Sequence, residues 1–192
     1  RARWGGDLIH IREAEFENPA MMDAALAQAD AVIHLAGVNR AHPSEIERVN
    51  PWLAEQLVAS MARTGRSIPV VYGNSIHSLG DSPFGVSKRR AADILREGSD
   101  LVDVVMPNIF GEQGVPNYNS VVATFCHALV AGQTPAVVDD KELPLIHVGR
   151  IADLLLDQAV APTPGTVSVE GRPTMVSEVA RRLTEMAEAY RI

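Results

Sequence analysis

The chain has 192 residues, the size of one domain, and its composition of 46% apolar and 21% charged residues is ordinary for a globular protein. No run approaches the ~20 apolar residues that a membrane-spanning helix needs, so we expect no membrane span. The net charge of −7, with no basic run longer than residues 88–90, excludes the usual footprint of a nucleic-acid-binding protein. The single cysteine, Cys126, fits a reducing, cytoplasmic compartment, and its apolar surroundings predict a buried side chain.

Short runs rich in valine, isoleucine and leucine alternate with longer amphipathic stretches. This alternation is typical of βαβ units, in which helices connect the buried strands of a parallel sheet. We therefore predict an α/β fold with a doubly wound parallel sheet and helices on both of its faces. The predicted strands are residues 8–11, 31–35, 68–72, 102–106, 136–138 and 166–169.

The helices are predicted from their caps and their apolar faces. Asn18 is a candidate N-cap with Pro19 at the first helical position, and Gly65 is a candidate stop for a helix over 51–64. Further helices are expected over 85–97 and from residue 175 to the end. The residues predicted to face the core are Leu53, Leu57, Met61, Ala91, Ile94, Leu95, Val176, Val179 and Leu183.

The second predicted strand ends in small residues, in "VIHLAGVNR". Ligands of open parallel sheets bind beyond the carboxyl ends of the strands, so Ala36 and Gly37 lie where a backbone can approach a ligand closely. A strand with a tight exit turn is the alternative. His34, inside the apolar run, is expected to be a core histidine with satisfied hydrogen bonds.

Several segments, in this order, form a joint pattern. "VIHLAG" is followed by a helix with Asn50, a strand that runs into Ser75, the Phe84-to-Lys88 spacing and "MPNIFG" at 106–111. This pattern resembles the extended short-chain dehydrogenase/reductases, the NAD-dependent epimerase/dehydratases. The resemblance implies a Rossmann-like domain, NADP or NAD as cofactor and a nucleotide-sugar substrate. The cofactor-binding positions that it implies are Leu35, Ala36, Gly37, Asn50 and Lys88, and Arg12 is a further candidate.

A narrower resemblance lies in "HLAGVNR" and in residues 116–130. These segments are similar to bacterial capsular-polysaccharide and O-antigen reductases of UDP-2-acetamido-2,6-dideoxy-hexoses, in which a cupin domain follows the Rossmann domain. The resemblance implies that residues 1–192 correspond at most to that first domain, with a small substrate-binding portion from about residue 107. The substrate-binding residues that it implies, for a UDP-sugar, are Asn108, Asn117, Tyr118 and Asn119.

By the same resemblance, Ser75 is a catalytic serine that hydrogen-bonds the reacting sugar oxygen. Lys88 is the lysine that holds the nicotinamide ribose and lowers the pKa of the catalytic tyrosine. A turn-forming Ser75, a solvated helix lysine at position 88 and a turn residue at Asn108 are the alternatives.

Phe84 occupies the tyrosine position, four residues before Lys88. A phenyl ring carries no proton, and loss of a general acid-base group typically costs about 10²- to 10⁴-fold in rate. His77, two residues after Ser75, is a candidate replacement because imidazole exchanges protons near neutral pH. Tyr72 and Tyr118 are the other candidates.

No Gly-rich turn of the G-x-G-x-x-G type is present in the chain. We expect the first strand, this turn and the first helix to be missing from it, and dinucleotide binding to be weak or absent. Arg12 could pair with the 2′-phosphate of NADP or could be a surface charge, so the cofactor stays open between NADP and NAD.

The favoured function is an NAD(P)-dependent reductase or epimerase of a nucleotide sugar in bacterial surface-polysaccharide synthesis, impaired by Phe84. Dehydratase chemistry is less favoured, because Ile76 and His77 stand where the family's dehydratases carry an Asp-Glu pair. The alternative is a non-catalytic binding or regulatory protein. The family also implies a possible homodimer through the helices near 51–64 and 85–97, and we expect no metal site.

Overall fold

The computed structural model describes residues 6–190. The chain divides into two compact units. Unit 1 comprises the chain up to Val105 together with Leu154–Ser168, and unit 2 comprises Met106–Asp153 and the chain from Val169 onward. Each unit has its own sheet, and the two are described separately below.

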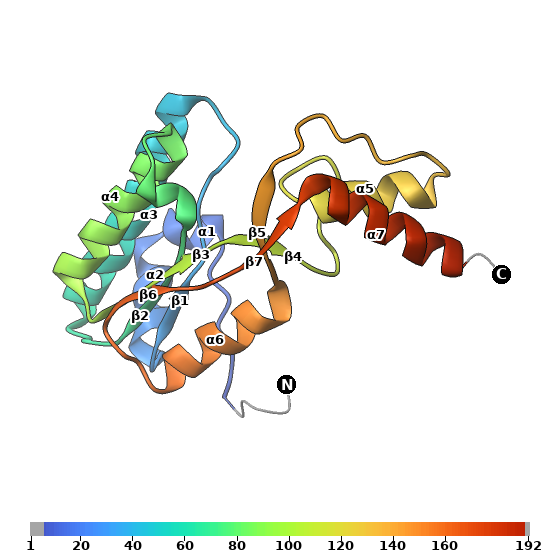
Figure 1. The fold of residues 1–192 in the computed structure, drawn as a ribbon. Coiled ribbons are helices and arrows are strands. Elements are labelled where there is room, and N and C mark those ends of the chain that lie inside the picture. The colour runs from blue at the N-terminus through green and yellow to red at the C-terminus, as the bar shows by residue number, and fades with distance from the viewer. Residues whose placement is uncertain (1–5, 191–192) are drawn as a thin grey trace. The chain divides into compact units, whose positions relative to one another are not determined.

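Unit 1 is built around a four-stranded sheet with the strand order β1-β2-β3-β6 (Figure 1). Strand β1 pairs parallel with β2, and β3 pairs parallel with β6. The strands are β1 (Val32–His34), β2 (Val70–Ser75), β3 (Leu101–Met106) and β6 (Gly165–Ser168). The helices up to β3 are α1 (Glu13–Phe16), α2 (Pro19–Gln28), α3 (Pro43–Thr64), the 3₁₀ helix η1 (Ile76–Leu79) and α4 (Pro83–Gly98).

The core of unit 1 lies where α3 and α4 pack side by side against the sheet. Leu57 of α3, Leu95 of α4 and Val70 of β2 are each at most 2% exposed. The predicted apolar faces of these helices are confirmed, since Leu53, Met61 and Ala91 are buried as well. This packing holds the loop after β1, the end of β2 and the start of α4 in one place.

Unit 2 contains a smaller sheet with the strand order β4-β5-β7. Strand β5 pairs parallel with β4 and antiparallel with β7. Its elements are β4 (Asn108–Phe110), α5 (Val121–Val130), β5 (Glu142–His147), β7 (Arg172–Met175) and α7 (Val176–Ala189), and α6 (Val148–Val160) extends across the boundary between the units. Phe125, Val176 and Val179 form its buried core, as the apolar face predicted for the last helix requires.

Two strand predictions are wrong. Residues 8–11 and 136–138 belong to no strand, and Leu8 and Val138 are 64% and 96% exposed. A short apolar run becomes a strand only where a neighbouring strand accepts and donates its hydrogen bonds, and no strand of the described chain pairs with either run. Strands β4, β5 and β7 lacked the continuous apolar run that identified the others.

Two further expectations need correction. Helix α3 begins at Pro43, not near residue 51, and Pro51 lies inside it. Cys126 is exposed, not buried, because α5 turns Phe125 and Leu129 toward its packing partners instead. The capping predictions are confirmed: Asn18 accepts from the backbone N–H groups of Ala20 and Met21, and Gly65 ends α3 with a φ of 63°.

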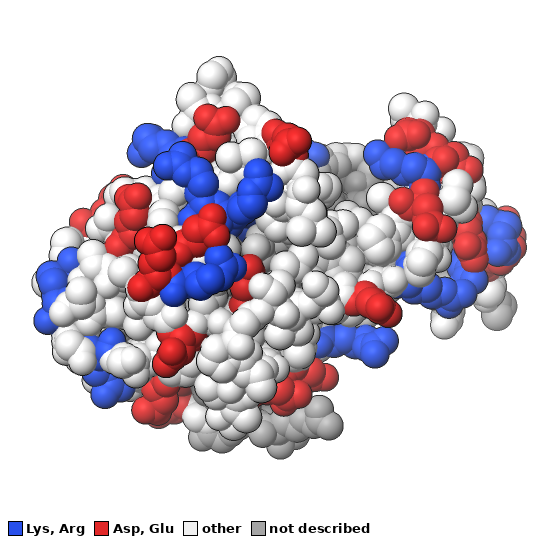
Figure 2. All heavy atoms as spheres, turned by 60° about the vertical axis from the view of Figure 1, so that its left-hand side comes forward, with Lys and Arg blue, Asp and Glu red and all other residues white. Residues whose placement is uncertain are grey.

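The surface carries both signs of charge in mixture. Figure 2 shows acidic and basic side chains interspersed over the face that it presents. Within residues 6–190, no helix is both long enough and apolar enough to cross a membrane.

Candidate functional site

The carboxyl end of β2 delivers Ser75. Its hydroxyl accepts a hydrogen bond from the backbone N–H of His77 at 3.2 Å and thereby caps η1. The backbone N–H of Ser75 itself donates to Oδ1 of Asn74 at 2.8 Å. Ser75 therefore forms a turn, as the alternative to a catalytic role predicted. Its hydroxyl can still donate a hydrogen bond to a substrate, because a hydroxyl can accept one hydrogen bond and donate another.

The start of α4 lies directly against η1, and Gly85 makes this possible. A Cβ at Gly85 would come within 2.1 Å of the His77 carbonyl oxygen, so only glycine fits this approach. The contact places the half-buried Phe84 beside His77, with ring centroids 6.2 Å apart in an edge-on arrangement. Phe84, at the expected tyrosine position, and His77, the suggested substitute for that tyrosine, are thus neighbours.

Lys88 lies one turn further along α4 and is only 5% exposed. Its Nζ donates to the Gly73 carbonyl oxygen at 2.8 Å and lies 4.0 Å from the centre of the Tyr72 ring. The alternative of a solvated helix lysine is therefore wrong. Burial lowers the pKa of Lys88 from 10.5 to about 7, and the negative charge of Asp103 opposes that change.

Tyr72 is a poor proton carrier as it stands. It is 1% exposed, and burial together with the Asp103 carboxylate raises its pKa well above the ordinary value of 10. Its hydroxyl donates to the Lys88 carbonyl oxygen at 3.5 Å. The aromatic ring of Tyr72 thus makes a cation–π contact with the ammonium group of Lys88.

Asn50 holds the loop that follows β1. Its Oδ1 accepts from the Val38 N–H at 2.7 Å, and its Nδ2 donates to the Val38 carbonyl at 2.9 Å and to Oγ of Ser87 at 2.8 Å. A Cβ at Gly37 would come within 3.1 Å of the Asn50 side chain. Asn50 is 2% exposed, so it supports the Ala36–Val38 backbone from beneath and does not itself point into open space.

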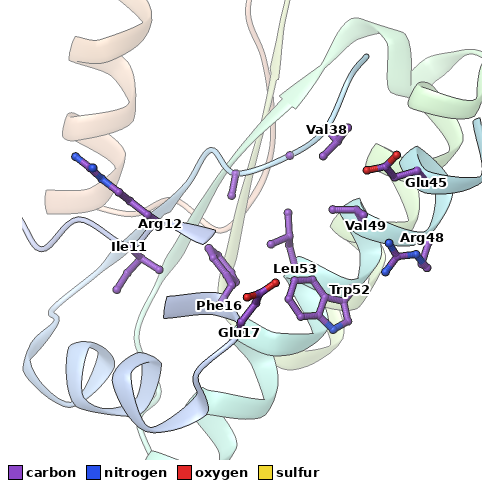
Figure 3. Close-up of a pocket in the computed structure, with 12 residues that line it drawn as sticks. Ile11, Arg12, Phe16, Glu17, Val38, Glu45, Arg48, Val49, Trp52 and Leu53 are labelled. Atoms are coloured by element: carbon purple, nitrogen blue, oxygen red, sulfur yellow. The ribbon is translucent and has the colours of Figure 1, made fainter. Parts of the chain in front are cut away.

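A cavity of about 420 Å³ lies beyond the carboxyl end of β1 (Figure 3), within the range that ligand pockets occupy. Phe16, Val49, Trp52 and Leu53 supply its apolar walls, and Ala36, Gly37 and Val38 its backbone edge. The charged side chains on it are Arg12, Glu17, Glu45 and Arg48. Leu35, by contrast, is 59% exposed and does not line the cavity.

The residues predicted to contact a sugar lie in unit 2. Asn108 is the first residue of β4 and pairs with Leu145 of β5, so it is a strand residue and not a turn residue. Asn117 has a φ of 57°, and its backbone N–H donates to Oγ1 of Thr124. Tyr118 is 44% exposed and precedes Asn119. The segment 117–119 leads directly into α5.

Two groups of residues at this site escaped the sequence prediction. Arg48 and Trp52 line the cavity from α3, and only the folded helix shows which of its faces they occupy. Asn74 and Asp103 lie buried beside Ser75 on adjacent strands. A single charge within "LVDVV" was the one available signal for Asp103, because a charged residue is rare in a buried strand.

The site and the fold together define a class of protein. Parallel strands joined by helices, with a cavity beyond the carboxyl end of a strand, characterise Rossmann-type domains, and the parallel pairing in unit 1 agrees with this class. No family model matches the chain.

Individual relatives narrow the class. The chain is 33% identical to a UDP-2-acetamido-2,6-beta-L-arabino-hexul-4-ose reductase from Pseudomonas aeruginosa over 171 residues, which are 83% of this chain and 46% of the relative. It also superimposes on the capsular polysaccharide assembling protein CapF from Staphylococcus aureus, with a TM-score of 0.75 and 29% identity over 94% of this chain and 50% of that one. The chain belongs to the extended short-chain dehydrogenase/reductase family, the NAD-dependent epimerase/dehydratases.

A more distant structure shares the fold. The Bordetella bronchiseptica enzyme WbmF, in complex with NAD⁺ and UDP, gives a TM-score of 0.80 at 17% identity and covers 99% of this chain and 66% of WbmF. The chain spans about half the length of its nearer relatives named above.

Proposed function

We propose that the protein is an NAD(P)-dependent reductase or epimerase of a UDP-sugar in bacterial surface-polysaccharide synthesis. The observation that carries the proposal is the burial of Lys88 beside the strand that ends in Ser75. Burying an ammonium group is costly, and a Rossmann-type site is a place where such a cation has a use. The resemblance to a reductase of a UDP-linked hexulose supports the sugar-nucleotide substrate.

The cavity suits part of a dinucleotide, although the given sequence has no Gly-rich turn to hold the pyrophosphate. Its apolar walls and the backbone beside Gly37 suit an adenosine moiety, and the guanidinium groups of Arg12 and Arg48 suit the phosphates of the cofactor. Lys88 donates one of its three N–H groups to Gly73, so two remain for ribose hydroxyls. The nicotinamide cofactor would exchange a hydride with the sugar carbon.

Ser75 orients the reacting oxygen of the sugar in this proposal. Its hydroxyl donates to that oxygen while it continues to accept from His77 N–H. Asn108, Asn117, Tyr118 and Asn119 are the proposed contacts for the sugar nucleotide. A cytoplasmic location and a homodimer through α3 and α4 are part of the same proposal.

Phe84 decides how active the protein is. The phenyl ring cannot move a proton, and His77, whose ring packs against it, is the group best placed to replace it. A residual turnover would then depend on His77, and a non-catalytic sugar-nucleotide-binding protein is the second candidate function.

The test is Phe84→Tyr in the protein as its gene encodes it. We expect the rate at which NADPH or NADH is oxidised by a UDP-4-keto-6-deoxy-hexose to rise about 10²- to 10⁴-fold, because the phenol of tyrosine restores proton transfer at the sugar oxygen. The absorbance of reduced nicotinamide gives the rate, and calorimetry with UDP gives the affinity.

Phe84→Leu is the matched control, since it changes the ring without adding a hydroxyl and should leave turnover low. Addition of His77→Ala to the unchanged protein should abolish its residual rate. If UDP binds but Phe84→Tyr gains nothing, the protein is a binding protein and the catalytic proposal fails.

A further inference from the structure

A carboxylate that the proposed chemistry does not use lies in the middle of β3. Asp103 is 5% exposed, with apolar neighbours along the strand. Burying a carboxylate costs several kcal/mol unless hydrogen bonds and opposite charges compensate it. Two side chains do so: Nδ2 of Asn74 donates to its Oδ1 at 2.9 Å, and Nη2 of Arg96 donates to its Oδ2 at 3.2 Å.

Asp103 determines which way the Asn74 amide faces. A carboxylate only accepts hydrogen bonds, so the NH₂ group of Asn74 must turn toward it. The amide oxygen is left to face the other way, where it accepts from the backbone N–H of Ser75 at 2.8 Å. Asn74 is 3% exposed, so no water competes for either end of its amide. A continuous chain of hydrogen bonds thus runs from Arg96 through Asp103 and Asn74 to Ser75.

The same carboxylate acts on Lys88 through its charge. The ammonium group lies 4.0 Å from the centre of the Tyr72 ring of β2, and charge effects couple it to His34 of β1 and Asp103 of β3. Burial raises the pKa of the Asp103 carboxyl, whereas the hydrogen bond from Asn74 and the positive charges of Arg96 and Lys88 lower it again. The negative charge of Asp103 favours the charged form of Lys88 against the effect of burial. Arg96 of α4 forms ion pairs with two carboxylates, the buried Asp103 of β3 and the exposed Asp93 of α4.

We infer that Asp103 is a positioning residue of the candidate site, which orients Ser75 through Asn74 and joins that strand to α4 through Arg96. The importance of Asp103 for catalysis rests on the proposed function. Its effects on Ser75 and Lys88 can be measured without that function. Asp103 therefore links the strand that carries the serine to the helix that carries the lysine.

The test uses the fact that the chain has two lysines, Lys88 and Lys141. Labelling lysine with ¹³C at Cε gives two NMR signals, one from Lys88 and one from Lys141. The signal of the exposed Lys141 is the internal reference, and the variant Lys141→Arg shows which signal belongs to which lysine. In Asp103→Asn we expect the pKa of Lys88 to fall below that of the unchanged protein, and the Ser75 amide to exchange with solvent faster than its neighbours in β2. Neither measurement requires cofactor, sugar or turnover.

Asp93→Asn is the matched control, because it removes the other carboxylate that Arg96 contacts and should leave both readouts unchanged. Asn74→Ala should also speed exchange at Ser75, because it removes the acceptor of the Ser75 N–H. Should Asp103→Asn not fold, Asp103→Asn/Arg96→Gln removes both members of the ion pair and is titrated in its place. An unchanged Lys88 titration together with unchanged exchange at Ser75 overturns the inference, whereas failure of UDP binding overturns only the proposed function.

Discussion

His34 is buried in the core as its sequence position predicts, but its hydrogen bonds are not satisfied as expected. It lies in the core as expected, 3% exposed and stacked on Tyr72 with ring centroids 5.4 Å apart. Its Nε2, however, has no hydrogen-bond partner among the described residues. Burial, helped by the positive charge of Lys88, lowers the pKa of His34 from 6.5 to about 4. The imidazole is therefore neutral in the folded protein at neutral pH.

This shift predicts a pH dependence of stability. Between about pH 6.5 and 4 the unfolded chain protonates His34 and the folded chain does not. The contribution of His34 to the free energy of unfolding therefore falls as the pH falls and levels off below about pH 4. The loss attributable to His34 is about 3 kcal/mol across that window. Urea unfolding at a series of pH values measures it.

His34→Phe is the comparison variant, because it keeps a ring against Tyr72 and has nothing to protonate. The difference between the two pH profiles isolates His34 from the carboxylates that titrate in the same range. Parallel profiles would show that His34 titrates alike in both states.

At the scale of elements, the close approach of α3 and α4 depends on one glycine. A Cβ at Gly98 would come within 2.4 Å of Cγ1 of Val58 on α3, although Gly98 lies in the last turn of α4 where alanine is the better helix former. The helices can approach so closely only because Gly98 has no side chain. The site depends on this packing, since α3 carries Asn50 and α4 carries Lys88.

We therefore predict that Gly98→Ala destabilises the protein by about 1–3 kcal/mol, the usual cost of overpacking. Val58→Ala removes the two methyl groups that the new Cβ would meet, so the double variant should recover most of that loss. A double-mutant cycle of unfolding free energies gives the coupling. If the effects of the two substitutions were additive, the destabilisation by Gly98→Ala would come from the backbone of α4 and not from contact with Val58.

The helix ends show what local sequence can and cannot predict. Asn18, Pro19 and Gly65 act through groups within a few residues, so their roles were readable in the sequence. The start of α3 was missed because Pro51 resembles a first helical residue. In the structure the helix continues through it from Pro43, and His42 supplies the cap by accepting from Ser44 N–H.

For the molecule as a whole, the two units differ in how much apolar surface they bury. Unit 1 has a core that joins α2, α3, α4, β2 and β3, whereas the core cluster of unit 2 consists of Phe125, Val176 and Val179 with half-buried neighbours. Strands β2 and β3 are almost entirely buried, and β7 is mostly exposed. Local stability follows the burial of apolar contacts around an element.

Native-state hydrogen exchange should therefore distinguish the two sheets. We expect the amides of β2 and β3 to exchange at least ~10-fold more slowly than those of β5 and β7, because opening the larger core exposes more apolar surface. Backbone amide spectra recorded after transfer to D₂O measure this. Equal protection in the two sheets would show that they open together.

The sequence by itself determined the α/β class, four of the six predicted strands and the order of Ser75, Phe84 and Lys88, because these depend on residue type and spacing along the chain. The narrow resemblance to UDP-sugar reductases was equally readable, and the relatives confirm it. The roles of the site residues stay predictions.

Only the tertiary structure decided which side chains meet. Asn74 reaches Asp103 because β2 and β3 are neighbours in the sheet, although 29 positions separate them in the chain. Lys88 is buried because α4 packs over that sheet, and the same amphipathic pattern would allow a solvated lysine. Hydrogen bonds and charge effects act over a few ångströms of space, so contacts between distant segments become visible only when the strands are paired and the helices packed.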